Sequence, residues 1–261
     1  LSLIAENYFL KKKFDLTMQI LQQFNKKNEI YYWYKIKKIA QIYANESSEK
    51  ISLDYLNEKV KELKNPSTKM HYDLGNVYKR FKKYNKAIEY YSLVLSELDE
   101  NSSTYADILY RRGGSFERLE RYEESDKDLL QSLKIRPNDP YTLNYLAYGW
   151  LERGYKIDES LDMLNKAYKQ KKDDPYIIDS VGWGYYLVGD YKNAERYLRK
   201  AVELLPGDPI ASDHYADALW QLNRKLQAKY FWESALNSDE VDENMKKDIK
   251  QKLRNGLKKY N

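Results

Sequence analysis

The sequence contains no cysteine and only two histidines, His71 and His214, which lie far apart. The absence of cysteine excludes disulfides, cysteine-based zinc sites and a thiol nucleophile. The histidines are not spaced as in HExxH, and neither a glycine-rich phosphate-binding loop nor a GxSxG turn occurs. We therefore expect no cofactor, no metal and no enzymatic activity.

Long apolar runs and a dense charge of one sign are also missing. No run of about 18 apolar residues is present, so we expect no membrane-spanning segment. The 45 basic and 40 acidic residues are well mixed and give a net charge of +5, so we expect no nucleic-acid partner. The chain begins at Leu1 within a helical pattern, so we interpret it as a fragment whose missing N-terminus would carry any signal sequence or lipid anchor.

What is abundant is charge together with aromatic side chains. Charged residues make up 33% of the chain and aromatic residues 15%, with 27 tyrosines. High charge alone suggests disorder, but disordered chains are poor in aromatic residues. A fold with a large surface and a thin aromatic core fits both facts, and stacked helical repeats are such a fold.

Small residues recur in one register along the chain. The clearest series has separations of 38, 34, 35 and 34 residues and consists of Gly75, Gly113, Ala147, Gly182 and Ala216. Two further series keep this register: Ala87, Ser125, Ser160, Ala194 and Ala228, and Val94, Ser132, Ala167, Ala201 and Ala235. Two helices approach closely where a small residue replaces a bulky one, so each unit is predicted to be a pair of packed helices.

Helix-terminating residues agree with this register. Asp139-Pro140, Asp174-Pro175 and Asp208-Pro209 each place an N-cap acid before a proline at the first helical position. Gly189-Asp190 ends one helix and caps the next within a repeat. Each unit is therefore predicted to be a helix–turn–helix.

The spacing resembles the tetratricopeptide repeat (TPR) family, which has small residues at its eighth, twentieth and twenty-seventh positions. The best match is Ile178 to Pro206, and the resemblance covers about Ser67 to Asp239. It implies an all-α fold, a TPR-type α-solenoid with a right-handed superhelix. It also implies a non-catalytic scaffold or adaptor that binds other proteins.

Three segments are predicted. Residues 1–66 form two degenerate, TPR-like hairpins, which either cap the array or form an interface. Residues 67–239 form five repeats, at about 68–105, 106–139, 140–174, 175–208 and 209–239. Residues 240–261 form a C-terminal capping helix. The oligomeric state stays open.

In the TPR family the first helices of the repeats line a groove, and this resemblance selects the candidate site. It predicts an aromatic groove that binds a peptide or protein partner through Tyr141, Asn144, Tyr145, Tyr148, Tyr176, Asp179, Trp183, Tyr186, Asp213, Asp217 and Trp220. It also predicts a secondary basic zone of Asn76, Lys79, Arg80, Arg111 and Arg118.

A narrower resemblance concerns the runs Leu143–Tyr148, Asp179–Tyr186 and Asp213–Trp220. They look like the C-terminal repeats of proteobacterial cell-envelope TPR lipoproteins, some of which are adaptors for a periplasmic protease. This resemblance favours a periplasmic or outer-membrane-associated bacterial lipoprotein, with the cytoplasm as the alternative location. Two other functions stay open: an accessory region of a larger enzyme such as a glycosyltransferase, and an RNA-binding helical repeat.

Overall fold

The computed structural model describes residues 1–63, 65–239 and 241–257, and the regular structure within these ranges is helical. The helices in chain order are α1 (Ser2–Leu10), α2 (Phe14–Leu21), α3 (Glu29–Glu46), α4 (Glu49–Lys61), α5 (Thr68–Arg80), α6 (Tyr84–Ser96), α7 (Ser103–Glu117), α8 (Tyr122–Ile135), α9 (Pro140–Glu152), α10 (Ile157–Gln170), α11 (Pro175–Leu187), α12 (Tyr191–Leu204), α13 (Pro209–Gln221), α14 (Lys225–Leu236) and α15 (Glu243–Asn255).

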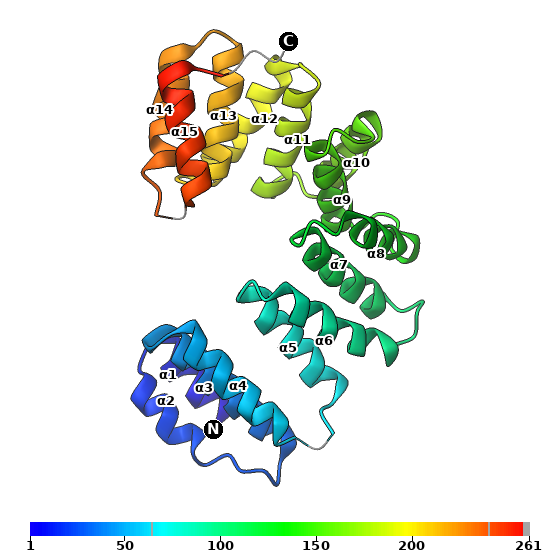
Figure 1. Ribbon diagram of the computed structural model, residues 1–261, viewed down its shortest axis with the longest axis vertical. Helices are drawn as coiled ribbons and strands as arrows, with labels where there is room; N and C mark the ends of the chain where they lie inside the picture. Colours follow the sequence, from blue (N-terminus) through cyan, green and yellow to red (C-terminus); the bar gives the residue numbers. More distant parts are fainter. Residues whose placement is uncertain (64, 240, 258–261) are drawn as a thin grey trace. The chain divides into compact units, whose positions relative to one another are not determined.

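Consecutive helices pack in pairs, from α1 with α2 to α13 with α14, and α15 follows as a single helix (Figure 1). The odd-numbered helix of each pair is called here the first helix and the even-numbered one the second helix. The predicted all-α organisation in helix–turn–helix units is confirmed.

The chain divides into two compact units, unit 1 (Leu1–Leu98) and unit 2 (Asp99–Asn261). Unit 1 contains a buried cluster formed by Ala5, Leu21, Phe24, Ile39 and Ile42. Unit 2 contains two clusters, one centred on α9 and α10 and the other on α13 and α14. The division falls between α6 and α7, within the predicted repeat 68–105.

The Asp-Pro pairs form the predicted helix starts in unit 2. The side chain of Asp139 accepts a hydrogen bond from the backbone N–H of Thr142 at 2.8 Å. Asp208 accepts the corresponding bond from Ala211 at 2.9 Å, and the prolines are the first residues of α9, α11 and α13. These bonds satisfy N–H groups that a helix leaves unpaired at its start.

The recurring small residues lie where helices touch. All fifteen members of the three series are buried. At Gly182, a Cβ atom would lie only 2.6 Å from Cγ of Leu198 in the second helix of the same hairpin. A larger side chain would push α11 and α12 apart, so the small residue at this position allows the two helices of the hairpin to pack closely.

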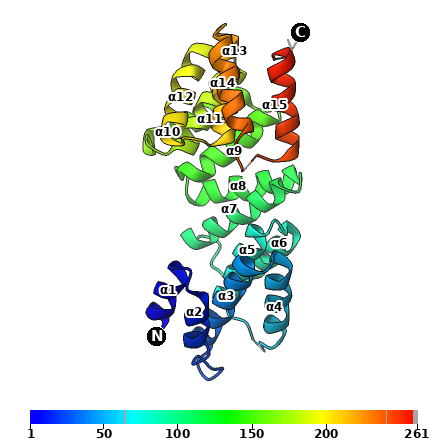
Figure 2. The ribbon, with the colours of Figure 1, turned by 90° about the vertical axis from the view of Figure 1, so that its left-hand side faces the viewer.

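The last helix, α15, packs along the final hairpin (Figure 2). Its apolar stripe consists of Met245, Ile249 and Leu253, and these side chains join the cluster of α13 and α14. Ile249 is fully buried. The predicted capping segment 240–261 contains α15, while its residues 240 and 258–261 lie outside the described residues.

Candidate functional site

The predicted groove residues lie on three neighbouring first helices of unit 2. Tyr141 to Tyr148 belong to α9, Tyr176 to Tyr186 to α11, and Asp213 to Trp220 to α13. Helix α11 contacts both α9 and α13, and α9 also contacts α7. The structure therefore brings these residues together on one surface, called here the first-helix face of unit 2.

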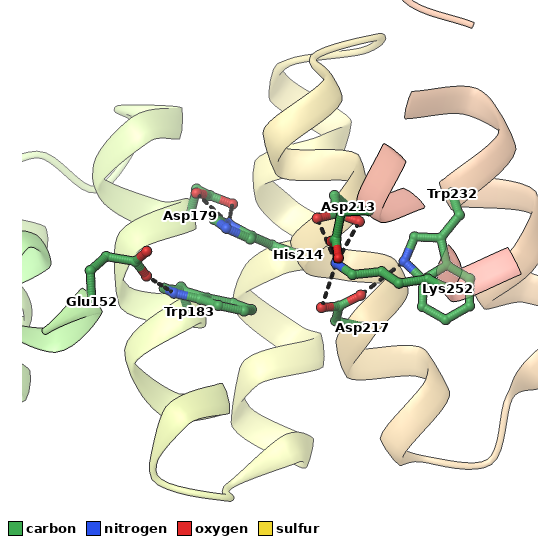
Figure 3. A network of polar contacts seen from close by, with 9 residues as sticks. Glu152, Asp179, Trp183, Asp213, His214, Asp217, Trp232 and Lys252 are labelled. Carbon is green, nitrogen blue, oxygen red and sulfur yellow. Dashed lines mark hydrogen bonds and ion pairs between the residues drawn. The ribbon is translucent and has the colours of Figure 1, made fainter. Parts of the chain in front are cut away.

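Hydrogen bonds connect each first helix on this face to the preceding one. The Tyr145 hydroxyl on α9 donates to Glu117 on α7 at 2.9 Å. The Trp183 indole N–H on α11 donates to Glu152 on α9 at 2.6 Å (Figure 3). Both aromatic residues were predicted to contact a partner, but their polar atoms bind neighbouring helices.

The next connection joins α13 to α11. Nδ1 of His214 lies 3.0 and 3.2 Å from the two carboxylate oxygens of Asp179 (Figure 3). Burial by itself would lower the pKa of His214, but the neighbouring carboxylates, Asp179 foremost, outweigh it and raise that pKa. The carboxylates thus favour the charged form of the imidazole more strongly than burial disfavours it.

Trp183 is held between two other rings. Its ring centroid lies 4.1 Å from that of His214, with the planes inclined by 13°, and 4.6 Å from that of Tyr186, inclined by 8°. Both faces of the indole are therefore covered. Burial raises the pKa of Tyr186 to about 12.

The last connection joins α15 to α13. Nζ of Lys252 lies 2.8 and 3.0 Å from the two oxygens of Asp213 and 3.0 Å from Asp217 (Figure 3). Asp217 also accepts a hydrogen bond from the Trp232 indole at 2.8 Å. These connections from α9 to α15, all running from a later helix to an earlier one, are called here the donor–acceptor ladder.

Two carboxylates share one ammonium group at this end of the ladder. Burial and the nearby charge of Asp213 raise the pKa of Asp217 to about 7, although Lys252 opposes this effect. Burial alone would lower the pKa of Lys252, but the carboxylates of Asp217 and Asp213 raise it above its usual value. Lys252 is therefore positively charged throughout the physiological pH range.

Helix α15 also limits access to the end of the predicted groove. A cavity of about 400 Å³ lies between α11, α13 and α15, and Trp183, Tyr186, Asp217, Lys252 and Gly256 are among its lining residues. Trp220 is half-buried beneath Gly256, where a Cβ atom would lie 2.1 Å from the indole. Nζ of Lys225 lies 3.7 Å from the Trp220 ring centroid. The predicted residues on α13 are thus engaged within the chain.

Four predicted residues have fewer intramolecular partners. Tyr141 and Tyr176 are 46% and 63% exposed, and Tyr148 is half-buried. Oδ1 of Asn144 is buried and accepts no hydrogen bond in the described part of the chain. An unpaired buried acceptor costs about 1–3 kcal/mol. Of the predicted groove residues, Tyr141 and Tyr176 are therefore the most exposed, and their contact with a partner stays a prediction.

The predicted basic zone spans both units. Asn76, Lys79 and Arg80 lie on α5 in unit 1, where Asn76 accepts a hydrogen bond from Tyr91 at 2.8 Å. Arg111 and Arg118 lie in unit 2, where Arg111 bonds to Asp107 at 2.8 Å. A joint role for these residues stays a prediction.

The predicted site omitted four residues that bond across this face: Glu117, Glu152, His214 and Lys252. The partners of Lys252 lie 39 and 35 residues before it, at Asp213 and Asp217. Lys252 itself stands beside the apolar stripe of a helix rich in lysine, so no local pattern separates it from its solvated neighbours. Glu117 and Glu152 occupy groove positions of their repeats, but their bonds to Tyr145 and Trp183 depend on how neighbouring repeats pack.

The described residues contain no group of three or more histidine and acidic side chains placed to hold a metal ion. Among the helices in the described ranges, none combines the length and apolar character needed to cross a membrane.

Comparison with known proteins agrees with this architecture. The tetratricopeptide repeat profile matches residues 68–97, 106–139 and 182–208. The crystal structure of TTC0263, a thermophilic TPR protein of Thermus thermophilus, superposes with a TM-score of 0.60 at 18% identity, over 72% of this chain and 100% of that one. MamA (41-end) from Desulfovibrio magneticus RS-1 has a TM-score of 0.54 at 16% identity, over 67% of this chain and 97% of that one.

No curated protein sequence matches the chain significantly. The helical-hairpin fold and the matched repeats together define the class, an all-α solenoid. Within this all-α fold, tetratricopeptide repeats are detected over residues 68–97, 106–139 and 182–208.

Proposed function

We propose that the chain is a non-catalytic scaffold that binds a protein partner across the first-helix face of unit 2. The observation that carries this proposal is a row of exposed apolar side chains at the start of three successive first helices. Tyr141, Tyr176 and Ile210 each follow the first-turn proline, and they are 46%, 63% and 52% exposed. We call these three residues the exposed row.

The exposed row suits a protein interface better than a structural role. Large aromatic and apolar side chains are enriched where proteins bind one another. Helices packed side by side lie about 8–10 Å apart, so a partner segment crossing α9, α11 and α13 would meet the three side chains in turn. In contrast, the rings of Tyr145 and Trp183 are fixed within the chain by the donor–acceptor ladder.

The test is affinity capture of partners by the immobilised chain. The variant Tyr141→Ser/Tyr176→Ser/Ile210→Ser should lose the captured protein, because truncating an interface hot spot costs about 2 kcal/mol or more. The control Leu130→Ser/Leu226→Ser/Tyr230→Ser removes exposed side chains from the second helices α8 and α14. Equal capture by both variants would contradict the proposal, provided that circular dichroism shows both to be folded.

The narrower proposal, an adaptor of a cell-envelope protease, is supported by the resemblance of the three runs alone. Its test is the identity of the captured protein. A protease captured by the wild-type chain and lost from the exposed-row variant would support it, whereas a cytosolic partner captured in the same way would oppose it.

A further inference from the structure

Helix α9 presents a row of hydrogen-bond acceptors on the first-helix face. Asn144, Tyr148 and Glu152 are spaced four residues apart, so they lie one above another on the same side of the helix. Glu117 of α7 lies beside them, since its Oε1 atom is 3.9 Å from where a Cβ atom of Gly149 would stand. We call Asn144, Tyr148 and Glu152 the α9 row.

Three of the corresponding positions on the next two first helices, Asp179, Asp213 and Asp217, bond to a nitrogen group of a later helix. On α13, Asp213 and Asp217 correspond to Asn144 and Tyr148, each 69 residues later, and Lys252 bonds to both. On α11, the corresponding Asp179 is bonded by Nδ1 of His214, whose pKa the nearby carboxylates raise. The chain thus shows twice which kind of group this face accepts.

The α9 row differs because the hydrogen bonds that the structure gives to Glu117 and Glu152 come from uncharged donors. In the described part of the chain, Glu117 is reached by the Tyr145 hydroxyl and Glu152 by the Trp183 indole. Neither donor offsets the negative charge of its carboxylate.

The electrostatics of Tyr148 agree with this geometry. The pKa of Tyr148 is raised, first by burial and then by three nearby carboxylates, those of Glu152, Asp179 and Glu117. Arg118 is the cation that acts against them. The surroundings of Tyr148 therefore hold more negative than positive groups.

We propose that a lysine or arginine side chain of a protein partner docks on the α9 row, as Lys252 docks on Asp213 and Asp217. The inference rests on the proposed function and names the partner chemistry: a segment that carries a basic residue beside apolar residues. The basic group would lie between Asn144 and Glu152, while the apolar residues contact the exposed row. Glu117 and Glu152 would supply the charge that selects it.

The test uses a phage-displayed random dodecapeptide library selected on the immobilised full chain. Selected peptides should be enriched in lysine or arginine, and their affinities are then measured by fluorescence anisotropy. In Glu117→Gln/Glu152→Gln, the amide oxygens still accept the bonds from Tyr145 and Trp183 while both charges are lost. We expect this variant to bind the basic peptides about three- to tenfold more weakly, with less dependence on salt concentration.

The matched control is Glu123→Gln/Glu203→Gln, which removes two exposed charges from the second helices α8 and α12 and should leave the affinity unchanged. Replacement of the basic residue of a selected peptide by glutamine should abolish the difference between the wild-type chain and Glu117→Gln/Glu152→Gln. Selection of neutral or acidic peptides that are lost only from the exposed-row variant would overturn this inference and leave the proposed function standing. Failure of the wild-type chain to select any peptide would overturn both.

Discussion

At the scale of single residues, the most unusual group is Asp217. It is 4% exposed, it accepts a hydrogen bond from Trp232, and it shares Lys252 with Asp213. One ammonium group cannot fully compensate two carboxylates in a buried site. The consequence is seen at Asp217, where burial and the charge of Asp213 raise the pKa to about 7.

This raised pKa predicts a pH-dependent stability. Asp217 holds its proton up to about pH 7 in the folded chain but only to about pH 3.9 when unfolded. The folded state therefore binds more protons between these values, and the contribution of Asp217 to stability falls as pH rises from about 4 to about 7. Asp217→Asn removes this titration, so the melting temperature of the wild-type chain minus that of the variant should be smaller at pH 8 than at pH 5.

Thermal unfolding followed by circular dichroism at both pH values measures this difference. Asp248→Asn is the control, since Asp248 also contacts Lys252 but its side chain is 59% exposed. If the melting temperature of the wild-type chain minus that of Asp217→Asn grows with pH, pairing of Asp217 with Lys252 outweighs its burial.

Several residue roles could not be predicted from the sequence. The groove positions of Asp179 and Trp183 follow from the TPR register, but their partners, His214 and Glu152, lie 35 and 31 residues away. A register shows which way a side chain points, not which atom of the neighbouring repeat it meets. Tyr141 and Tyr176 were predicted by the same register, and their contact with a partner stays a prediction.

At the scale of elements, α15 depends on one buried side chain more than on its many charges. Ile249 is fully buried against the final hairpin, whereas Lys250 is exposed. We expect Ile249→Ala to lower the free energy of unfolding by about 2–5 kcal/mol, because it leaves a cavity between α15 and α14. Lys250→Ala should change it by no more than about 0.5 kcal/mol.

Urea denaturation followed by tryptophan fluorescence measures both values, since Trp220 and Trp232 lie in this region. Equal effects of the two substitutions would show that α15 is held by its polar contacts instead of its apolar stripe.

Helix positions were the most predictable feature of the elements. Asp-Pro pairs mark the starts of α9, α11 and α13, because an N-cap acid and a first-turn proline act within one helical turn. The small-residue series identified the paired helices, because contact within a hairpin repeats at a fixed interval. The docking of α15 against α13 through Lys252 has neither a local nor a periodic signal.

At the scale of the whole molecule, each unit has a core of its own. The two clusters of unit 2 are formed from residues 129–249, all within that unit. We therefore expect the fragment 99–261 to fold alone, with a helical circular dichroism spectrum and one cooperative thermal transition. The fragment 150–261 should unfold less cooperatively, because it lacks Leu143, Leu146 and Ala147 of the α9 and α10 cluster. A broad, non-cooperative transition of the longer fragment would indicate that unit 2 requires unit 1.

The donor–acceptor ladder distinguishes the hairpins of unit 2 from one another, because each carries a different pair of polar groups. Glu117 accepts a bond from a phenol, Glu152 from an indole and Asp213 from an ammonium group, and Asp179 pairs with an imidazole, each on the next odd-numbered helix. A hairpin moved to another place would present the wrong group to its neighbour and leave a carboxylate without its donor. The order of these repeats is therefore encoded in their side chains, and shuffling or duplicating them as interchangeable modules should fail even though their backbones are alike.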